Sequence, residues 1–194
     1  MNRPEEKSGA FLALLLPLQK SLEVYCRRIL RNPSDAEDVL QSAIMEAFAR
    51  FDRYAEGTNF RAWMFRFVTL EAFNRNRKRE PALLSESLDD IPIQPPEELP
   101  EDVLDMLVGN PGPMMEHFED RLVHALWLLT PSERAVLLLR AVGEFSYQEM
   151  HEILSIPLGS VMGYLSRARQ KMKRSLLDSA AQPDPCRRNE DPQR

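Results

Sequence analysis

Residues 146–176, SYQEMHEILSIPLGSVMGYLSRARQKMKRSL, decide how we interpret the fold of this chain. Ser146 followed by Glu149 is a capping box, which predicts the start of a short helix. The segment 155–157, Ser-Ile-Pro, predicts a tight turn, and residues 159–176 predict a longer helix with several cations. A short helix, a brief turn and a longer basic helix form a helix-turn-helix, whose second helix fits the major groove of DNA.

The second helix of this motif would meet base edges with its first residues and phosphates with its later cations. The capped start of the first helix could bind phosphate as well. The candidate DNA-contacting residues are Ser146, Gln148, Ser160, Met162, Tyr164, Ser166, Arg167, Arg169 and Lys171. The alternative is a plain helical hairpin with a solvated basic face. The turn length, the cap and the charge placement together favour DNA binding.

The rest of the chain also reads as helix, with no strand pattern, so we predict an all-α protein. Two small helical domains, 10–80 and 114–178, would be joined by an acidic, Pro-rich flexible linker at 81–113, with a disordered tail at 179–194. We expect helices at 10–31 (bent at Pro17), 35–50 (after a Ser34/Glu37 capping box), 60–79, 114–129 and 131–142 (capped at Thr130).

The charge map supports this division. Residues 1–80 and 121–194 each have a net charge of +3, whereas residues 81–120 contain no Lys or Arg and have a net charge of −11. The cations bunch at the ends of two predicted helices, at 75–79 and 167–174. Cations complement a helix C-terminus, but these runs exceed what one dipole needs, and we interpret them as phosphate-facing surfaces.

Composition excludes several classes of protein. The two cysteines, Cys26 and Cys186, are far apart, so a disulfide framework or a zinc site is not expected, and a reducing cytosol fits. The longest apolar run, residues 10–18, is about half of a membrane span, so we expect no membrane insertion. The three histidines are dispersed and there is no glycine-rich phosphate loop, which makes an enzyme the least supported class.

The chain resembles the sigma-70 family of bacterial transcription initiation factors, in its compact extracytoplasmic-function type. Residues 129–140, LTPSERAVLLLR, are similar to the opening of the family's region 4. Residues 145–150 and 156–161, FSYQEM and IPLGSV, are similar to its helix-turn-helix, and residues 165–169, LSRAR, to the helix that reads the −35 promoter element. The resemblance implies that the helix-turn-helix candidates given above contact −35 DNA.

Residues 35–43, DAEDVLQSA, resemble the family's region 2.2, the helix that grips the clamp coiled coil of RNA polymerase. An acidic and amidic ridge beside apolar side chains suits a basic helical partner. The resemblance implies core-polymerase contacts at Asp35, Asp38, Leu40, Gln41 and Ile44.

Residues 60–66, FRAWMFR, resemble the entry into regions 2.3 and 2.4, where the −10 element is melted. Opening a duplex requires a pocket for unstacked bases and cations for the separated strands. The resemblance implies −10 contacts at Asn59, Phe60, Arg61, Trp63, Arg66, Asn74, Arg75, Arg77 and Lys78. Helical spacing alone favours a core position for Trp63.

Departures from the family pattern occur at a few positions. Thr69 and Leu70 stand where an Arg-Asn pair is usual, and Met162 replaces a frequent cation. His151 replaces a small residue, and we expect it to crowd the helix pair. Ser155 stands where the turn usually has Gly, and we expect a left-handed backbone there at a cost of about 1 kcal/mol.

The resemblance implies a cytoplasmic sigma factor that directs RNA polymerase to promoters without a cofactor or metal. Its implied partners are core RNA polymerase, promoter DNA and an anti-sigma factor, and the acidic linker is implied to lie in the RNA-exit path. Two alternatives stay open. A stand-alone helix-turn-helix regulator explains residues 130–176 but gives no purpose to Asp38 and Gln41. A mimic that sequesters an anti-sigma protein is supported by the departures alone.

Overall fold

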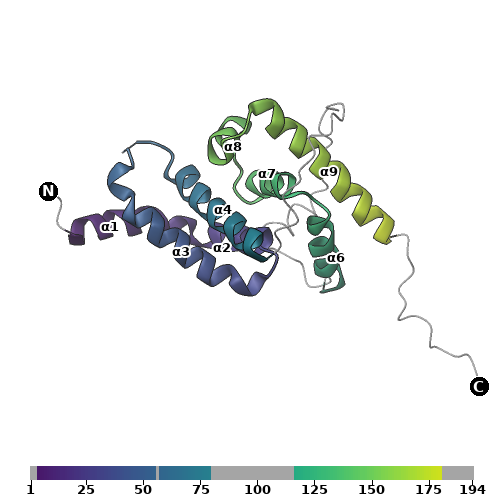
Figure 1. Cartoon of the computed structure of the whole chain (residues 1–194), viewed down its shortest axis with the longest axis horizontal. Helices are drawn as coiled ribbons and strands as arrows, with labels where there is room; N and C mark the ends of the chain where they lie inside the picture. Colours follow the sequence, from purple (N-terminus) through teal and green to yellow (C-terminus); the bar gives the residue numbers. More distant parts are fainter. Residues whose placement is uncertain (1–3, 56, 80–115, 181–194) are drawn as a thin grey trace, which may run out of the picture.

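The computed structural model describes residues 4–55, 57–79 and 116–180 (Figure 1). In these ranges the chain forms helices and turns, with no strand, as predicted. The linker predicted at 81–113 and the tail beyond residue 180 lie outside the described residues.

The described helices form two groups that lie side by side, with the N-terminal group in purple to teal and the C-terminal group in green to yellow (Figure 1). The N-terminal group consists of α1 (Pro4–Leu15), η1 (Leu16–Leu18), α2 (Gln19–Ile29), η2 (Pro33–Asp35), α3 (Ala36–Ala49), η3 (Phe51–Arg53) and α4 (Phe60–Arg79). The C-terminal group consists of α6 (Glu116–Trp127), α7 (Pro131–Ala141), α8 (Tyr147–Leu154) and α9 (Leu158–Ala180).

Local sequence signals explain most helix boundaries. Pro17 interrupts the first predicted helix as expected, because its missing N–H forces the 3-10 turn η1 between α1 and α2. Thr130 and Ser146 each form the complete capping box that the sequence predicts, with Glu133 and Glu149 respectively.

Three boundary predictions were wrong. The predicted capping box at Ser34 is replaced by a turn in which the Asn32 side chain accepts a hydrogen bond from the Ser34 N–H. Pro33, which follows Asn32, holds this turn in the 3-10 form, so α3 begins only at Ala36. In addition, α1 begins at Pro4 instead of residue 10, and α9 extends to Ala180.

The two groups share one continuous core. Phe65 of α4 and Phe145, which precedes α8, are both buried, and their rings meet edge to face with centroids 5.0 Å apart. A second contact joins the groups where the guanidinium of Arg31 lies 4.9 Å from the Trp127 ring. The arrangement of the two groups is therefore set by buried aromatic packing as well as by polar contacts.

Departures of the backbone from ordinary geometry cluster around the helix-turn-helix. Glu144 and Ser155 have positive φ angles of 50° and 55°. The chain passes so tightly between α7 and Phe145 that a Cβ atom on Gly143 would lie 2.6 Å from the Leu139 carbonyl oxygen. A left-handed backbone costs an L-residue about 1–2 kcal/mol, so Glu144 occupies a strained position.

We expect Glu144→Gly to raise the free energy of unfolding by about 1 kcal/mol, because it relieves the left-handed strain and the flexibility of glycine in the unfolded chain offsets only part of the gain. Urea denaturation followed by circular dichroism measures the change. The same substitution at Glu152, an exposed position inside α8, is the control and should lower stability by about 1 kcal/mol. A loss of stability for Glu144→Gly would contradict the strain argument.

Candidate nucleic-acid and polymerase interfaces

The exposed face of α3 presents part of the predicted polymerase site. Asp38 and Gln41 are exposed, and Leu40 and Ile44 are half-buried beside them. Met45, which the sequence reasoning missed, is 65% exposed and lies one helical turn beyond Gln41. Asp38, Gln41 and Met45 are spaced i, i+3, i+7, and this spacing could have predicted that Met45 shares their helix face. This face combines an acid, an amide and apolar side chains, as a basic helical partner requires.

Asp35 differs from the other polymerase candidates because it is only 8% exposed. Its Oδ1 atom lies 3.7 Å from Arg75 Nη1, which ties the start of α3 to the end of α4. Arg75, a −10 candidate, is therefore drawn into the protein by this ion pair. The sequence could not reveal the contact, because forty residues separate the two side chains.

The aromatic cluster next to the loop before α4 consists of Phe11, Phe48, Phe51, Tyr54, Phe60, Trp63 and Phe67, whose rings meet at centroid distances of 4.8–6.4 Å. Phe60 is buried in it, whereas Tyr54 and Trp63 are half-buried at its surface. Trp63 thus has the packing role that its spacing favoured, although it is only half-buried. The Asn59 side chain caps α4 by accepting a hydrogen bond from the Ala62 N–H at 3.0 Å.

The C-terminal end of α4 keeps three −10 candidates exposed, namely Asn74, Arg77 and Lys78. Arg77 donates to the Asn74 side chain at 3.1 Å. Thr69 and Leu70, which depart from the family pattern one turn earlier on α4, differ from each other in burial. Thr69 is buried and donates to the Phe65 carbonyl, while it accepts a 2.7 Å hydrogen bond from the Tyr25 hydroxyl. Leu70 is exposed, so Leu70 is the part of this departure that faces solvent.

Two further −10 candidates contact the helix-turn-helix directly. Arg66 Nη1 donates to the carbonyl oxygens of Glu152 at 2.7 Å and Ile153 at 3.3 Å, and to Ser155 Oγ at 2.7 Å. It therefore neutralises the last turn of α8, where carbonyl groups lack partners inside the helix. Asn59 Nδ2 donates to Glu149 Oε1 at 2.5 Å.

The capped start of α8 holds Glu149 in its charged form. The Ser146 N–H and hydroxyl both donate to the Glu149 carboxylate, at 2.8 and 2.7 Å, and together they lower the pKa of Glu149. Arg61 and Asn59 add to this lowering from across the junction. The hydroxyl of Ser146, a −35 candidate, is thus engaged in the cap, while its neighbour Gln148 is exposed.

The turn between α8 and α9 has the geometry that the sequence predicts. Ser155 adopts the left-handed conformation with φ 55° and ψ 42°. The ring of His151 is half-buried, and its Nδ1 is 2.6 Å from the Ile156 carbonyl oxygen. Since a carbonyl only accepts, Nδ1 carries the proton, and His151 closes the turn.

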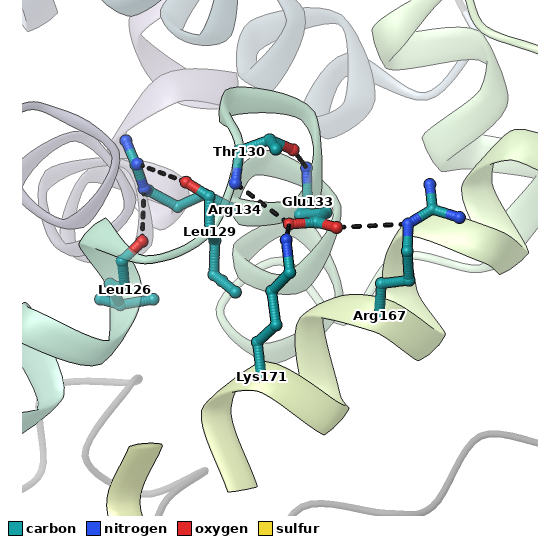
Figure 2. A network of polar contacts seen from close by, with 7 residues as sticks. All are labelled: Leu126, Leu129, Thr130, Glu133, Arg134, Arg167 and Lys171. Atoms are coloured by element: carbon teal, nitrogen blue, oxygen red, sulfur yellow. Dashed lines mark hydrogen bonds and ion pairs between the residues drawn. The ribbon is translucent and has the colours of Figure 1, made fainter. Parts of the chain in front are cut away.

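The first turns of α9 carry the predicted reading residues. Met162 is 39% exposed, and Ser160, Tyr164, Ser166 and Arg169 are half-buried. Arg167 and Lys171 behave differently, because both bind the buried carboxylate of Glu133 on α7 (Figure 2). Sequence reasoning assigned these two cations to −35 DNA and did not foresee their bonds to Glu133.

The neighbouring Arg134 is also buried and explains how α6 and α7 are joined. Its Nε and Nη2 atoms donate to the carbonyl oxygens of Leu126 and Leu129, each at 2.9 Å (Figure 2). Its guanidinium lies 3.6 Å from the centroid of the Trp127 ring. This arginine holds the end of α6 against the start of α7, the helix that precedes the helix-turn-helix.

Among the described residues, no group of His, Cys, Asp and Glu side chains could hold a metal ion. In the same ranges, no helix is both long and apolar enough to cross a membrane.

Comparisons with known proteins agree with this geometry. Residues 15–81 match the family model for sigma-70 region 2, and residues 119–172 match the model for sigma-70 region 4. The first match coincides with the α3 and α4 surfaces, and the second with the helix-turn-helix. Together the two matches cover well over half of the chain.

Similar proteins are described as ECF RNA polymerase sigma factors. The chain is 27% identical to the ECF RNA polymerase sigma factor SigW of Bacillus subtilis over 156 residues, which cover 79% of this chain and 81% of SigW. It is 28% identical to SigG of Mycobacterium tuberculosis over 200 residues, covering 93% of this chain and 53% of SigG. The chain therefore spans about half the length of SigG.

Two solved structures share the fold. The sigma factor RpoE of Bartonella quintana, in complex with the anti-sigma factor NepR, superimposes with a TM-score of 0.66 at 24% identity, covering 87% of this chain and 97% of RpoE. CnrH, in complex with the cytosolic domain of CnrY, gives a TM-score of 0.62 at 24% identity, covering 89% and 90% of the two chains. Two sigma-70 regions in the expected order, on an all-α fold of two helical units, show that the chain belongs to the sigma-70 family of RNA polymerase sigma factors and is of the extracytoplasmic-function type.

Proposed function

We propose that this sigma factor binds core RNA polymerase through the exposed face of α3. The observation that carries the proposal is the coincidence of Asp38, Gln41 and Met45 on one solvent-facing stripe within the region 2 match. Acidic and amidic groups beside apolar ones offer both charge complementarity and burial to a basic helix. The chain supplies binding surfaces in the cytoplasm, and the polymerase carries out the catalysis.

Promoter DNA is divided between the two helical groups in this proposal. The cationic end of α4 with Asn59, Trp63 and Arg66 takes the −10 element, and the exposed residues of α8 and α9 take the −35 element. In this proposal the exposed Gln148 and Met162 and the half-buried Arg169 face the groove or its phosphates. The similar structure of RpoE contains the anti-sigma factor NepR, and we propose a protein of that class as a further partner of this chain.

Use of both DNA sites requires the two helical groups to separate. Asn59 and Arg66 are bonded to α8, so neither can contact −10 DNA while α4 and α8 touch. We propose that the described arrangement is the closed, inactive form. An anti-sigma factor that holds the two groups together would keep the −10 residues covered.

The decisive experiment mixes the full chain with bacterial core polymerase and fragmented genomic DNA and maps the start sites of the transcripts by sequencing. Discrete starts that require the chain, preceded by shared −35 and −10 sequences, are the expected result. Duplex binding without any binding of polymerase would instead support the stand-alone regulator. Loss of both activities, with binding to an anti-sigma protein, would support the mimic.

The α3 assignment predicts a selective defect. Asp38→Arg with Gln41→Ala should lower the affinity for core polymerase at least about tenfold, because it places a cation and a gap against a basic helix. Fluorescence competition with labelled chain measures the affinity. The matched control is Glu23→Arg with Gln19→Ala, an exposed acid and amide that bond each other on α2. Equal affinity of the two double variants for core polymerase would contradict the assignment of α3 to the interface.

The closed form makes a separate prediction for the free chain. Arg66→Met removes three hydrogen bonds to the end of α8, so we expect amides of residues 145–156 to exchange with solvent about tenfold faster. Hydrogen-exchange mass spectrometry reports the rates. Arg50→Met is the control, because Arg50, which directly follows α3, pairs with Glu46 of that helix. Unchanged exchange in Arg66→Met would show that Arg66 does not hold the two groups together.

A further inference from the structure

Glu133 is a buried acid in the first turn of α7. Its side chain is 3% exposed, and its Oε2 atom accepts a 3.0 Å hydrogen bond from the Thr130 N–H, which completes the capping box. A buried carboxylate is costly unless charges and donors surround it. The capping bond alone supplies one donor, so the remaining partners matter.

Those partners come from the helix that is proposed to read DNA. Arg167 Nε donates to Glu133 Oε1 at 3.2 Å, and Lys171 Nζ donates to Oε2 at 2.7 Å (Figure 2). The two cations are four residues apart on α9, so they share the helix face that points toward α7. One carboxylate therefore holds two cations that lie one helical turn apart on α9.

The cap itself does not require these cations. Glu149 occupies the same position in the capping box of α8, and its carboxylate bonds Ser146 and Asn59. Glu133 performs the same capping function on α7 and, in addition, binds two side chains of another helix. The second role is thus separable from the first by comparing the two glutamates.

The Arg167 side chain is held in one orientation by this contact. Its guanidinium lies 5.0 Å from the Tyr164 ring, and its side chain is 17% exposed. The side chain passes beside Gly163, where a Cβ atom would lie in van der Waals contact with Arg167 Nη1 at 3.4 Å. Glu133 takes the Nε atom, and the two Nη atoms point away from the carboxylate (Figure 2).

We propose that Glu133 is a specificity-determining residue for −35 DNA, which acts by positioning Arg167 and by withholding Lys171 from the phosphates. A preorganised arginine discriminates between bases because the wrong base cannot be accommodated by reorientation. A free cation, in contrast, attracts any phosphate regardless of sequence. This inference rests on the proposed −35 binding by α9.

The test uses the holoenzyme of core polymerase with the full chain and a pool of duplexes randomised in the upstream promoter element. Glu133→Gln keeps an oxygen that can accept the capping hydrogen bond but removes the negative charge that holds Arg167 and Lys171. We expect the enrichment of the preferred sequence to fall about tenfold, the discrimination worth one good base contact. On a duplex of fixed mixed sequence, the log–log salt slope of binding should steepen by about 1, because one freed cation adds one phosphate contact.

Glu149→Gln is the matched control, because it weakens a capping box without touching Arg167 or Lys171. It should leave the salt slope unchanged. Equal enrichment and equal slopes for Glu133→Gln and the wild type would overturn the inference. A wild-type holoenzyme that enriches no upstream sequence would overturn the proposed −35 binding itself, and the inference with it.

Lys171→Gln keeps the inference testable if Glu133→Gln fails to fold. Since Glu133 already holds Lys171, this single variant should leave the salt slope unchanged. A slope reduced by about 1 would show that Lys171 contacts phosphate in the wild type and would overturn the proposal.

Discussion

The ring of Phe145 is the contact on which the arrangement of the whole molecule depends. It is buried where α7 ends and α8 begins, and it meets Phe65 of α4 edge to face. The guanidinium of Arg61 lies 5.2 Å from the same ring. Burial of a phenylalanine contributes about 1.5–3 kcal/mol, and an aromatic pair about 0.5–1.5 kcal/mol more. Phe145 thus supplies the buried aromatic part of the junction between two small helical units, beside the polar contacts of Arg66 and Asn59.

The backbone around Phe145 is built to place this ring. Gly143 is required because a Cβ atom there would lie 2.4 Å from the Phe145 ring. The Phe145 N–H bonds the Leu139 carbonyl, and the Phe145 carbonyl accepts a hydrogen bond from Arg140. The strain at Glu144 follows from this tight passage, since the chain must reverse between α7 and α8 within a few residues. The local geometry of the helix-turn-helix and the contact between the two units therefore have the same origin.

Local features of the fold could be predicted from the sequence, because they depend on neighbours in the chain. The bounds of α4, the capping boxes at Thr130 and Ser146, and the left-handed Ser155 each follow from a few adjacent residues. The roles of particular charges could not be predicted in this way. Arg66 is 86 residues from the first carbonyl group that it binds, and Arg167 is 34 residues from Glu133. A cation in a sequence looks the same whether its partner is a phosphate or a distant carboxylate.

The candidate site illustrates the same limit. Asp38 and Gln41 were predictable as exposed residues, because the apolar positions around them define the buried face of α3. Asp35, one turn earlier, has the same chemistry in the sequence but is buried against Arg75. The difference depends on where the end of α4 lies, which is a tertiary fact. Acidic character alone thus does not distinguish an interface residue from a structural one.

The contacts at the junction also indicate which partner could open the proposed closed form. Arg66 would exchange carbonyl oxygens for phosphate oxygens on binding −10 DNA, so its own contacts are replaced by similar or stronger ones. The Phe65–Phe145 contact has no such replacement, because DNA phosphates cannot compensate for exposed aromatic surface. The free energy of separating these rings must come from a partner that binds the two units apart from each other and covers apolar surface. Core polymerase would meet this requirement by binding the C-terminal group in addition to the α3 face, and polymerase binding would then precede the use of either DNA site.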